Sequence, residues 1–202
     1  AQPVPVRSPG SRSVQGVPRH NRTNDGVVAL IVPGIGNSGP GHWQSLWEQG
    51  HPGWQRVQQR DWDRPVCEEW LRNLDAAMAR LSAPPVLIAH SMGCLLVVHW
   101  AQRSRVPVRA AFLVAPPDPE GPAFPPVAQG FGTVPTDSLP FPSLVVASSD
   151  DPFGSVAYAR RCAADWGSDF VEIAAAGHIN ADSGLGDWPV GLALLDRLLK
   201  SS

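Results

Sequence analysis

The feature that most constrains this chain is a serine placed between a short apolar run and a longer apolar segment. The run at residues 86–89 follows the breaker pair Pro84-Pro85 and predicts a strand buried on both faces. Residues 92–101 are apolar almost all round, which is typical of a buried helix. Ser91 therefore lies where strand meets helix. A sharp turn there lifts the serine hydroxyl above the edge of the sheet, in the arrangement called a nucleophile elbow.

The residues around Ser91 match the elbow pattern G-x-S-x-G only in part. Ala89 replaces the first glycine, whereas Gly93 keeps the second. Small residues are needed because the two backbones approach closely, and alanine adds a single methyl group. An ordinary serine that caps a core helix would give a similar pattern. Partners elsewhere in the chain must decide between these interpretations.

Strand-like and helix-like segments alternate along the chain, without internal repeats. Strands are predicted at residues 27–32, 56–60, 86–89, 108–115, 144–147 and 170–174, and those at 27–32, 86–89 and 108–115 should be buried. Helices are predicted at residues 42–48, 67–81, 92–101, 154–166 and 190–200, the last with Leu192, Leu195, Leu198 and Leu199 inward. This alternation predicts an α/β fold with a parallel sheet and helices on both faces.

Composition limits the class of protein. The chain has 202 residues, 43% of them hydrophobic and 17% charged, as expected for one soluble globular domain at residues 26–202. Residues 1–25 are rich in Pro, Ser, Arg and Gly and predict a disordered or surface-draped tail, or alternatively a basic arm for an acidic partner. A net charge of −2 gives no reason to expect nucleic acid, and no run is long enough for a membrane partner.

The three cysteines have neither metal-ligand spacing nor an even disulfide framework. This pattern predicts small, unpaired thiols in the core, as in proteins of a reducing compartment. No signal peptide is visible, so we expect a cytoplasmic protein. No histidine has a companion at metal-ligand spacing. We therefore predict no metal and no cofactor.

Polar groups follow four of the predicted strands. These groups are the loop at residues 33–41, Ser91, the pair Asp150-Asp151, and His178. Since the carboxyl ends of parallel strands meet at one edge, they should lie together. The order Ser, Asp, His is that of α/β-hydrolases, in which a histidine activates the serine and a carboxylate orients the histidine.

The loop at residues 33–41 and the long segment at residues 116–142 are candidates for binding substrate. The first has no Walker or G-x-G-x-x-G pattern, which favours an oxyanion loop over a phosphate cradle. The second holds nine prolines, and long loops of this kind are often functional. This segment contains Phe124, Phe131 and Phe141. Either these side chains line an acyl pocket, or they pack the loop against the body of the protein.

Histidines and a tryptophan flank these motifs. His42 and Trp43 follow the glycine-rich loop and either contact substrate or anchor that loop. His90 precedes the serine and is expected to pack structurally. Asp151 precedes Pro152, so it is also a possible N-cap of the following helix.

The chain resembles the retinoblastoma-binding-protein-nine-like serine hydrolases, especially the compact bacterial members, from about residue 27 to its end. The matching motifs are PGIGNSGPGHWQ at 33–44, DWDRP at 61–65, HSMGC at 90–94, SSDDPF at 148–153 and GHINADSG at 177–184. The resemblance implies a compact α/β-hydrolase fold with a six-stranded parallel sheet and little or no cap domain. It also implies a triad of Ser91, Asp151 and His178, with backbone N–H groups of Ile35 and Met92 as the oxyanion hole. Ala89 is the departure from the pattern.

These observations predict a serine hydrolase that acts on small carboxylic esters or related acyl compounds through an acyl-enzyme at Ser91. The same triad would also serve an acyltransferase or a peptidase. A different class is a protein-binding module, non-catalytic or weakly catalytic, on a hydrolase scaffold. The pocket-protein motif L-x-C-x-E is absent, so the sequence indicates a small-molecule acyl substrate and no particular protein partner.

Overall fold

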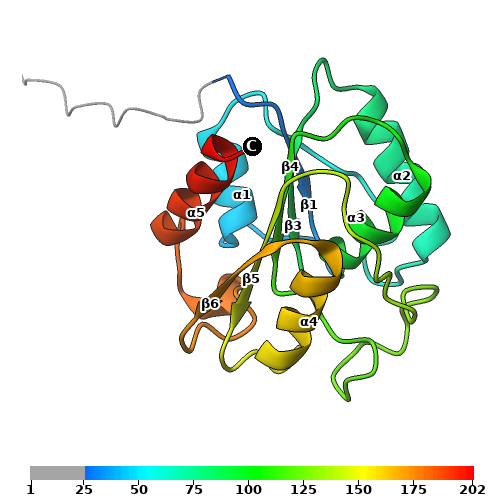
Figure 1. Ribbon diagram of the computed structural model, residues 1–202, viewed down its shortest axis with the longest axis vertical. Coiled ribbons are helices and arrows are strands. Elements are labelled where there is room, and N and C mark those ends of the chain that lie inside the picture. The colour runs from blue at the N-terminus through cyan, green and yellow to red at the C-terminus, as the bar shows by residue number, and fades with distance from the viewer. Residues whose placement is uncertain (1–25) are drawn as a thin grey trace, which may run out of the picture.

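The computed structural model describes residues 26–202, and the tail predicted at residues 1–25 lies outside the described residues (Figure 1). Six parallel strands form one sheet in the order β2-β1-β3-β4-β5-β6. The predicted α/β fold is therefore confirmed. None of the helices in residues 26–202 is long and apolar enough to cross a membrane.

The observed elements follow the predicted alternation. The strands are β1 (Ala29–Val32), β2 (Gln55–Arg56), β3 (Val86–His90), β4 (Ala110–Val114), β5 (Ser143–Ser148) and β6 (Asp169–Ile173). The helices are α1 (Trp43–Gly50), α2 (Cys67–Ala79), α3 (Met92–Arg103), α4 (Val156–Trp166) and α5 (Pro189–Lys200), with a short 3-10 helix η1 (Ala181–Ser183).

The second strand differs from its prediction at residues 56–60. It is only two residues long and lies at the edge of the sheet, so a single neighbour supports it. Val57, which lies within the predicted range, follows the end of the observed strand. The Val57 N–H still donates to the Ile31 carbonyl at 3.0 Å, and the side chain is fully buried.

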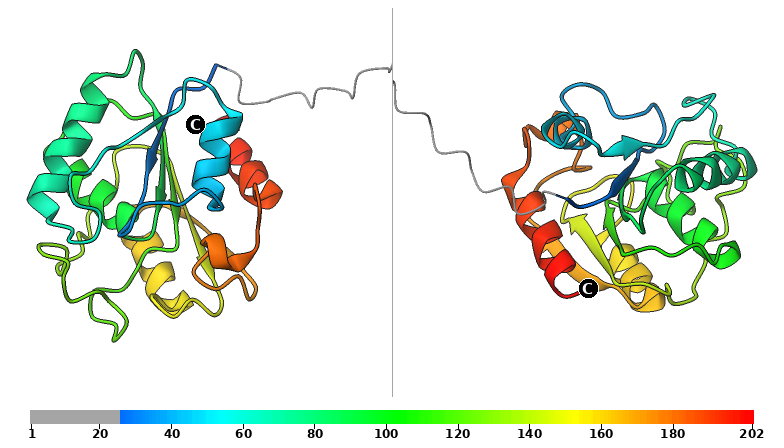
Figure 2. Two further views of the ribbon diagram at one scale, coloured as in Figure 1. Left: turned by 180° about the vertical axis from the view of Figure 1, so that it is seen from behind. Right: turned by 90° about the horizontal axis from the view of Figure 1, so that it is seen from above.

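Helices cover both faces of the sheet, α1 and α5 on one side and α2, α3 and α4 on the other (Figures 1 and 2). Successive residues of β3 point to opposite layers, so Leu87 and Ala89 pack toward α2 and α3, whereas Val86 and Ile88 pack toward α1 and α5. Both faces of β3 are buried, which explains why the strand is apolar from Val86 to Ala89.

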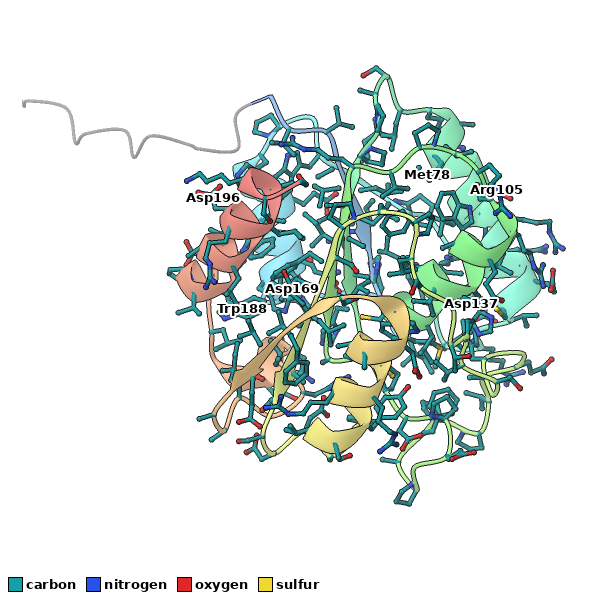
Figure 3. All side chains as sticks on the ribbon, in the orientation of Figure 1. Met78, Arg105, Asp137, Asp169, Trp188 and Asp196 are labelled. Carbon is teal, nitrogen blue, oxygen red and sulfur yellow. The ribbon has the colours of Figure 1, made fainter. Side chains whose placement is uncertain are left out.

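The layer that holds α1 and α5 contains a cluster of tryptophans. Trp43 lies 4.6 Å from Trp47 and 5.0 Å from Trp188, measured between ring centroids, and Trp188 caps the start of α5 (Figure 3). Along α5, Leu194 is buried where Leu192 was predicted to be, and Leu192 is only half-buried. The other three predicted leucines of α5 are buried.

Candidate active site

Ser91 occupies a strained turn between β3 and α3. Its backbone has φ 55° and ψ −124°, a conformation that non-glycine residues rarely adopt. The Ser91 N–H donates to the Val114 carbonyl at 2.8 Å, which ties the turn to β4. The hydroxyl makes no capping hydrogen bond to α3, so Ser91 is not an ordinary helix cap.

Close backbone contact explains the small residues at this turn. A Cβ on Gly93 would lie 2.2 Å from the Val32 carbonyl oxygen, a distance at which backbone would have to move. A Cβ on Gly34 would meet the Met92 nitrogen at 3.1 Å. Ala89 is fully buried among core side chains, so its methyl group is accommodated where the usual pattern has glycine.

His178 connects Ser91 with Asp151. Its Nε2 lies 2.8 Å from the Ser91 Oγ, and its Nδ1 lies 2.9 Å from both carboxylate oxygens of Asp151. A carboxylate only accepts, so Nδ1 carries the proton and Nε2 faces the serine as an acceptor. The Asp151 side chain is 2% exposed and that of His178 is 11% exposed, which shields the pair from water.

The adjacent carboxylate of Asp150 has a different environment. Its Oδ1 accepts from the Ser148 Oγ and the Gly177 N–H, both at 2.8 Å, and these bonds lower the Asp150 pKa. Asp151 does not cap α4, because the N-cap is Ser155. The structure thus brings Asp151, and not Asp150, to His178.

A cavity of about 240 Å³ opens beside Ser91. It is lined by Gly34, Ile35, Asn37, His42, His90, Ser91, Met92, Pro117, Pro125, Phe153, His178 and Asn180. Within residues 26–202, the N–H groups of Ile35 and Met92 donate to no other protein group. Larger hollows of about 600, 380 and 290 Å³ lie elsewhere, and neither Ser91 nor His178 lines any of these three.

The predicted substrate-binding residues divide into two groups. His42 lines the cavity, whereas Trp43 is 1% exposed and donates its indole N–H to the Ile179 carbonyl at 2.8 Å, anchoring the segment next to His178. Phe131 is also 1% exposed and packs 6.0 Å from Trp70, between ring centroids, in the core.

Phe124 is half-buried against the same core cluster, and neither it nor Phe131 lines the cavity. Phe141 packs there as well. Of the two interpretations of these phenylalanines, the structure agrees with packing onto the body and not with an acyl pocket. Burial of their apolar rings accounts for this position, and Pro117 and Pro125 are the two residues of 116–142 that line the cavity.

Three histidines lie in contact beside the serine. The ring centroids of His42 and His90 are 4.6 Å apart, and those of His90 and His178 are 4.9 Å apart. Burial lowers the pKa of His42 to about 4, with a smaller contribution from Arg56, and burial holds the His90 pKa well below its usual range. Both rings are therefore neutral near pH 7.

His90 does more than pack. Its Nε2 lies 2.9 Å from the His178 carbonyl oxygen, so the neutral ring donates a hydrogen bond to the backbone that carries His178. Nothing in its place before Ser91 indicated this contact, because the two residues are far apart in the sequence. Asn37, Phe153 and Asn180 were likewise not singled out, although all three lie in the quoted motifs.

No group of three metal-ligating side chains that could hold an ion occurs in the part of the chain that the structure describes. The three cysteines are free and buried. Burial raises the pKa of the Cys67 and Cys162 thiols to about 11 and that of Cys94 well above its usual range. These thiols are inert core groups.

Comparisons with known proteins agree with this geometry. No curated protein matches the chain. A structure described as a YdeN-like hydrolase from Pectobacterium atrosepticum is 31% identical, with a TM-score of 0.79, and the match covers 89% of this chain and 94% of that chain.

Two further structures share the fold. The ydeN gene product of B. subtilis is 19% identical, with a TM-score of 0.69, and the match covers 86% of this chain and 99% of that one. A thermophilic esterase from Thermogutta terrifontis is 20% identical, with a TM-score of 0.62 and coverages of 87% and 90%. Residues 29–197 match the family model described as serine hydrolase. The chain therefore belongs to the serine hydrolase family within the α/β-hydrolase superfamily, as its motifs predicted.

Proposed function

We propose that the protein hydrolyses small carboxylic esters through an acyl-enzyme at Ser91. The observation that carries the proposal is the continuous path from the Ser91 Oγ through His178 to the shielded carboxylate of Asp151. This path ends in a cavity that two unpaired backbone N–H groups, of Ile35 and Met92, also reach. A nucleophile, a base, an orienting acid and oxyanion donors are the groups that acyl transfer requires.

The reaction follows from these positions. The Ser91 Oγ attacks the ester carbonyl while its proton passes to the His178 Nε2, and Asp151 stabilises the resulting imidazolium. The N–H groups of Ile35 and Met92 donate to the oxyanion of the tetrahedral intermediate. Collapse breaks the bond to the alcohol, which takes the proton from Nε2. A water molecule then attacks the acyl-enzyme with His178 as base and releases the acid and free Ser91.

Cavity size supports small substrates. About 240 Å³ is below the roughly 300–1,000 Å³ of sites for drug-sized ligands. Residues 116–142 contribute only Pro117 and Pro125 to its wall, so no cap domain extends the pocket. That the structurally similar Thermogutta terrifontis protein is an esterase supports the same reaction class. Since all three thiols are free and buried, we also place the protein in the reducing cytoplasm.

The test is hydrolysis of p-nitrophenyl esters by wild-type protein and Ser91→Ala. We expect turnover of the acetate and butyrate, weaker turnover of the octanoate, and a loss of at least about 10³-fold in kcat for Ser91→Ala. Ser104→Ala, at the far end of the same helix, is the matched control and should remain active. Turnover by a folded Ser91→Ala protein at the wild-type rate would contradict the proposal.

A further inference from the structure

We propose that the cavity selects acyl substrates that carry an oxygen acceptor in addition to the scissile carbonyl, and that the side-chain amides of Asn37 and Asn180 bind it. The inference rests on the proposed function and names the substrate class of the same site. Both residues line the cavity with Ser91 and His178. Neither takes part in the proton path, so both side chains remain for recognition.

The orientation of the Asn37 amide follows from its partners. Its Oδ1 accepts from the Ser38 N–H at 2.8 Å and from the Arg56 Nη1 at 2.9 Å. A guanidinium can only donate, so the atom that faces it must be the amide oxygen. Arg56 is itself fixed by an ion pair with Glu48 at 2.7 Å, and its side chain is 11% exposed. The Asn37 Nδ2 therefore points away from Arg56 and the Ser38 N–H.

Asn180 is oriented by the 3-10 helix that follows it. Its Oδ1 accepts from the Asp182 N–H at 3.1 Å, and Ser183 completes a capping box with the Asn180 backbone. Again the oxygen is engaged and the nitrogen is not. Among the described residues, the Nδ2 atoms of Asn37 and Asn180 have no hydrogen-bond acceptor. Each amide nitrogen carries two N–H donors.

The rest of the cavity decides what these donors can bind. Its other walls combine the neutral rings of His42 and His90 with apolar side chains, which are Ile35, Met92, Pro117, Pro125 and Phe153. No carboxylate lines it, because Asp151 is buried against His178. An ammonium group would therefore find no counterion, and an all-carbon chain would cover the amide donors without replacing their water. An ether, hydroxyl, carbonyl or carboxylate oxygen satisfies them.

The experiment compares esters that differ by one CH₂-to-O exchange. On the acyl side the pair is p-nitrophenyl methoxyacetate and p-nitrophenyl butyrate; on the alcohol side it is 2-methoxyethyl butyrate and butyl butyrate. For each pair, the ratio of kcat/KM is measured for wild-type protein, Asn37→Asp and Asn180→Asp. Comparing ratios between proteins cancels the different intrinsic reactivities of the esters.

Aspartate keeps the Oδ1 that Arg56 and the 3-10 helix require, and it replaces the amide donors by an acceptor. We expect the oxygen-to-carbon ratio of at least one pair to fall about tenfold in one or both variants, as for a lost hydrogen bond. The ester 2-(dimethylamino)ethyl butyrate, a cation at neutral pH, should change in the opposite direction. Asn73→Asp adds the same charge on α2, where its amide donates to Gln59, and should keep the wild-type ratios.

The possible results separate the two proposals. Ratios that stay within about twofold of wild type for both pairs, in both variants, overturn the role of the amides while ester hydrolysis by Ser91 stands. If the oxygen-to-carbon ratio falls equally in Asn73→Asp, the effect comes from net charge, and the role of the amides is overturned as well. If the folded wild-type protein hydrolyses none of these esters, the proposed function fails and this inference fails with it.

Discussion

The two halves of the active-site edge are held by different forces. In the half that follows β1 and β3, backbone packs directly on backbone, as Gly93 against Val32 and the strained turn at Ser91 show. In the half that follows β5 and β6, side-chain hydrogen bonds position the loops. There the Ser148 Oγ accepts from the Ala176 N–H at 2.9 Å, and Asp150 accepts from the Gly177 N–H at 2.8 Å.

This difference determines which substitutions each half should tolerate. At Gly93 the elbow half has no space for an added Cβ, and at Gly34 it has little, so tolerance at these positions is limited by size. The acid–base half depends on which atoms accept and which donate, so an isosteric change of chemistry matters more there than a change of volume. Five substitutions test that contrast, in order from the largest expected effect to the smallest.

Asp151→Asn should have the largest effect, in the half governed by hydrogen bonds. Asparagine can keep the oxygen that faces the Phe153 N–H and the His178 Nδ1, but it removes the negative charge that stabilises the imidazolium. It also places an NH₂ donor beside Nδ1 in place of the second oxygen, which favours the wrong tautomer. We expect kcat on p-nitrophenyl butyrate to fall by about 10⁴-fold with unfolding free energy little changed. A loss of less than tenfold in a folded variant would remove Asp151 from the mechanism.

Gly93→Ala tests the half governed by size. The added methyl group would lie 2.2 Å from the Val32 carbonyl oxygen, so we expect a loss of about 3 kcal/mol or more in unfolding free energy, measured in urea. Ala89→Gly is the opposite change at the other small position of the elbow. It should cost only about 1 kcal/mol, for the added backbone entropy in a strand. Equal effects at both positions would contradict the steric account.

His42→Asn tests the buried polar group of the elbow half. His42 caps α1 through its Nδ1, and asparagine caps equally well without titrating. The folded pKa of about 4 lies below the unfolded value of 6.5, so between these values only the unfolded chain takes up the proton. Stability present above pH 6.5 is therefore lost as pH falls toward 4. Between pH 7 and pH 5, wild-type protein should lose about 2 kcal/mol more than the variant.

Urea titrations at the two pH values measure this difference directly. Burial is the largest cause of the lowered His90 pKa and is present in both proteins, whereas the smaller effect of His42 on His90 is lost in the variant. The difference between the two proteins therefore reports mainly on His42. An identical pH dependence in wild type and variant would show that His42 is not held neutral by burial.

Asp150→Asn should have the smallest effect. Asparagine retains an oxygen that can accept from the Ser148 hydroxyl and from the Gly177 N–H, so the loop before His178 should keep its place. We expect kcat to fall by about tenfold or less, as for a group that acts through a neighbour. If Asp150→Asn is the inactive variant and Asp151→Asn is active, the contacts seen at His178 are not those used in the reaction.

The sequence predicted the elbow half better than its surroundings because its determinants are local. A buried strand, Ser91, Gly93 and a buried helix are adjacent in the chain, and each constrains the next. The choice between Asp150 and Asp151 was not local: residue patterns left both at the end of β5, and the family resemblance favoured Asp151. In the structure Asp150 contacts Gly177 and Asp151 contacts His178, and both partners follow the neighbouring strand β6, 27 residues further along the chain.

The long loop shows where sequence reasoning could not choose between two alternatives. Phe124 and Phe131 follow a strand that ends at the site, which allows either an acyl pocket or packing onto the body. Their positions depend on the space between α2 and α3, where Phe131 packs against Trp70, and no periodicity within a proline-rich loop encodes that destination. The orientation of the Asn37 and Asn180 amides could not be predicted from the sequence either, because it depends on contacts with Arg56 and on the capping box.

The central claim is that Ser91 is the nucleophile, and covalent labelling tests it most directly. Folded wild-type protein is treated with a fluorophosphonate, and the adduct is located by intact-mass and peptide mass spectrometry. The account predicts a single adduct on Ser91, absent from Ser91→Ala and strongly slowed in Asp151→Asn. An adduct on another residue, or no adduct on folded wild-type protein, would contradict it.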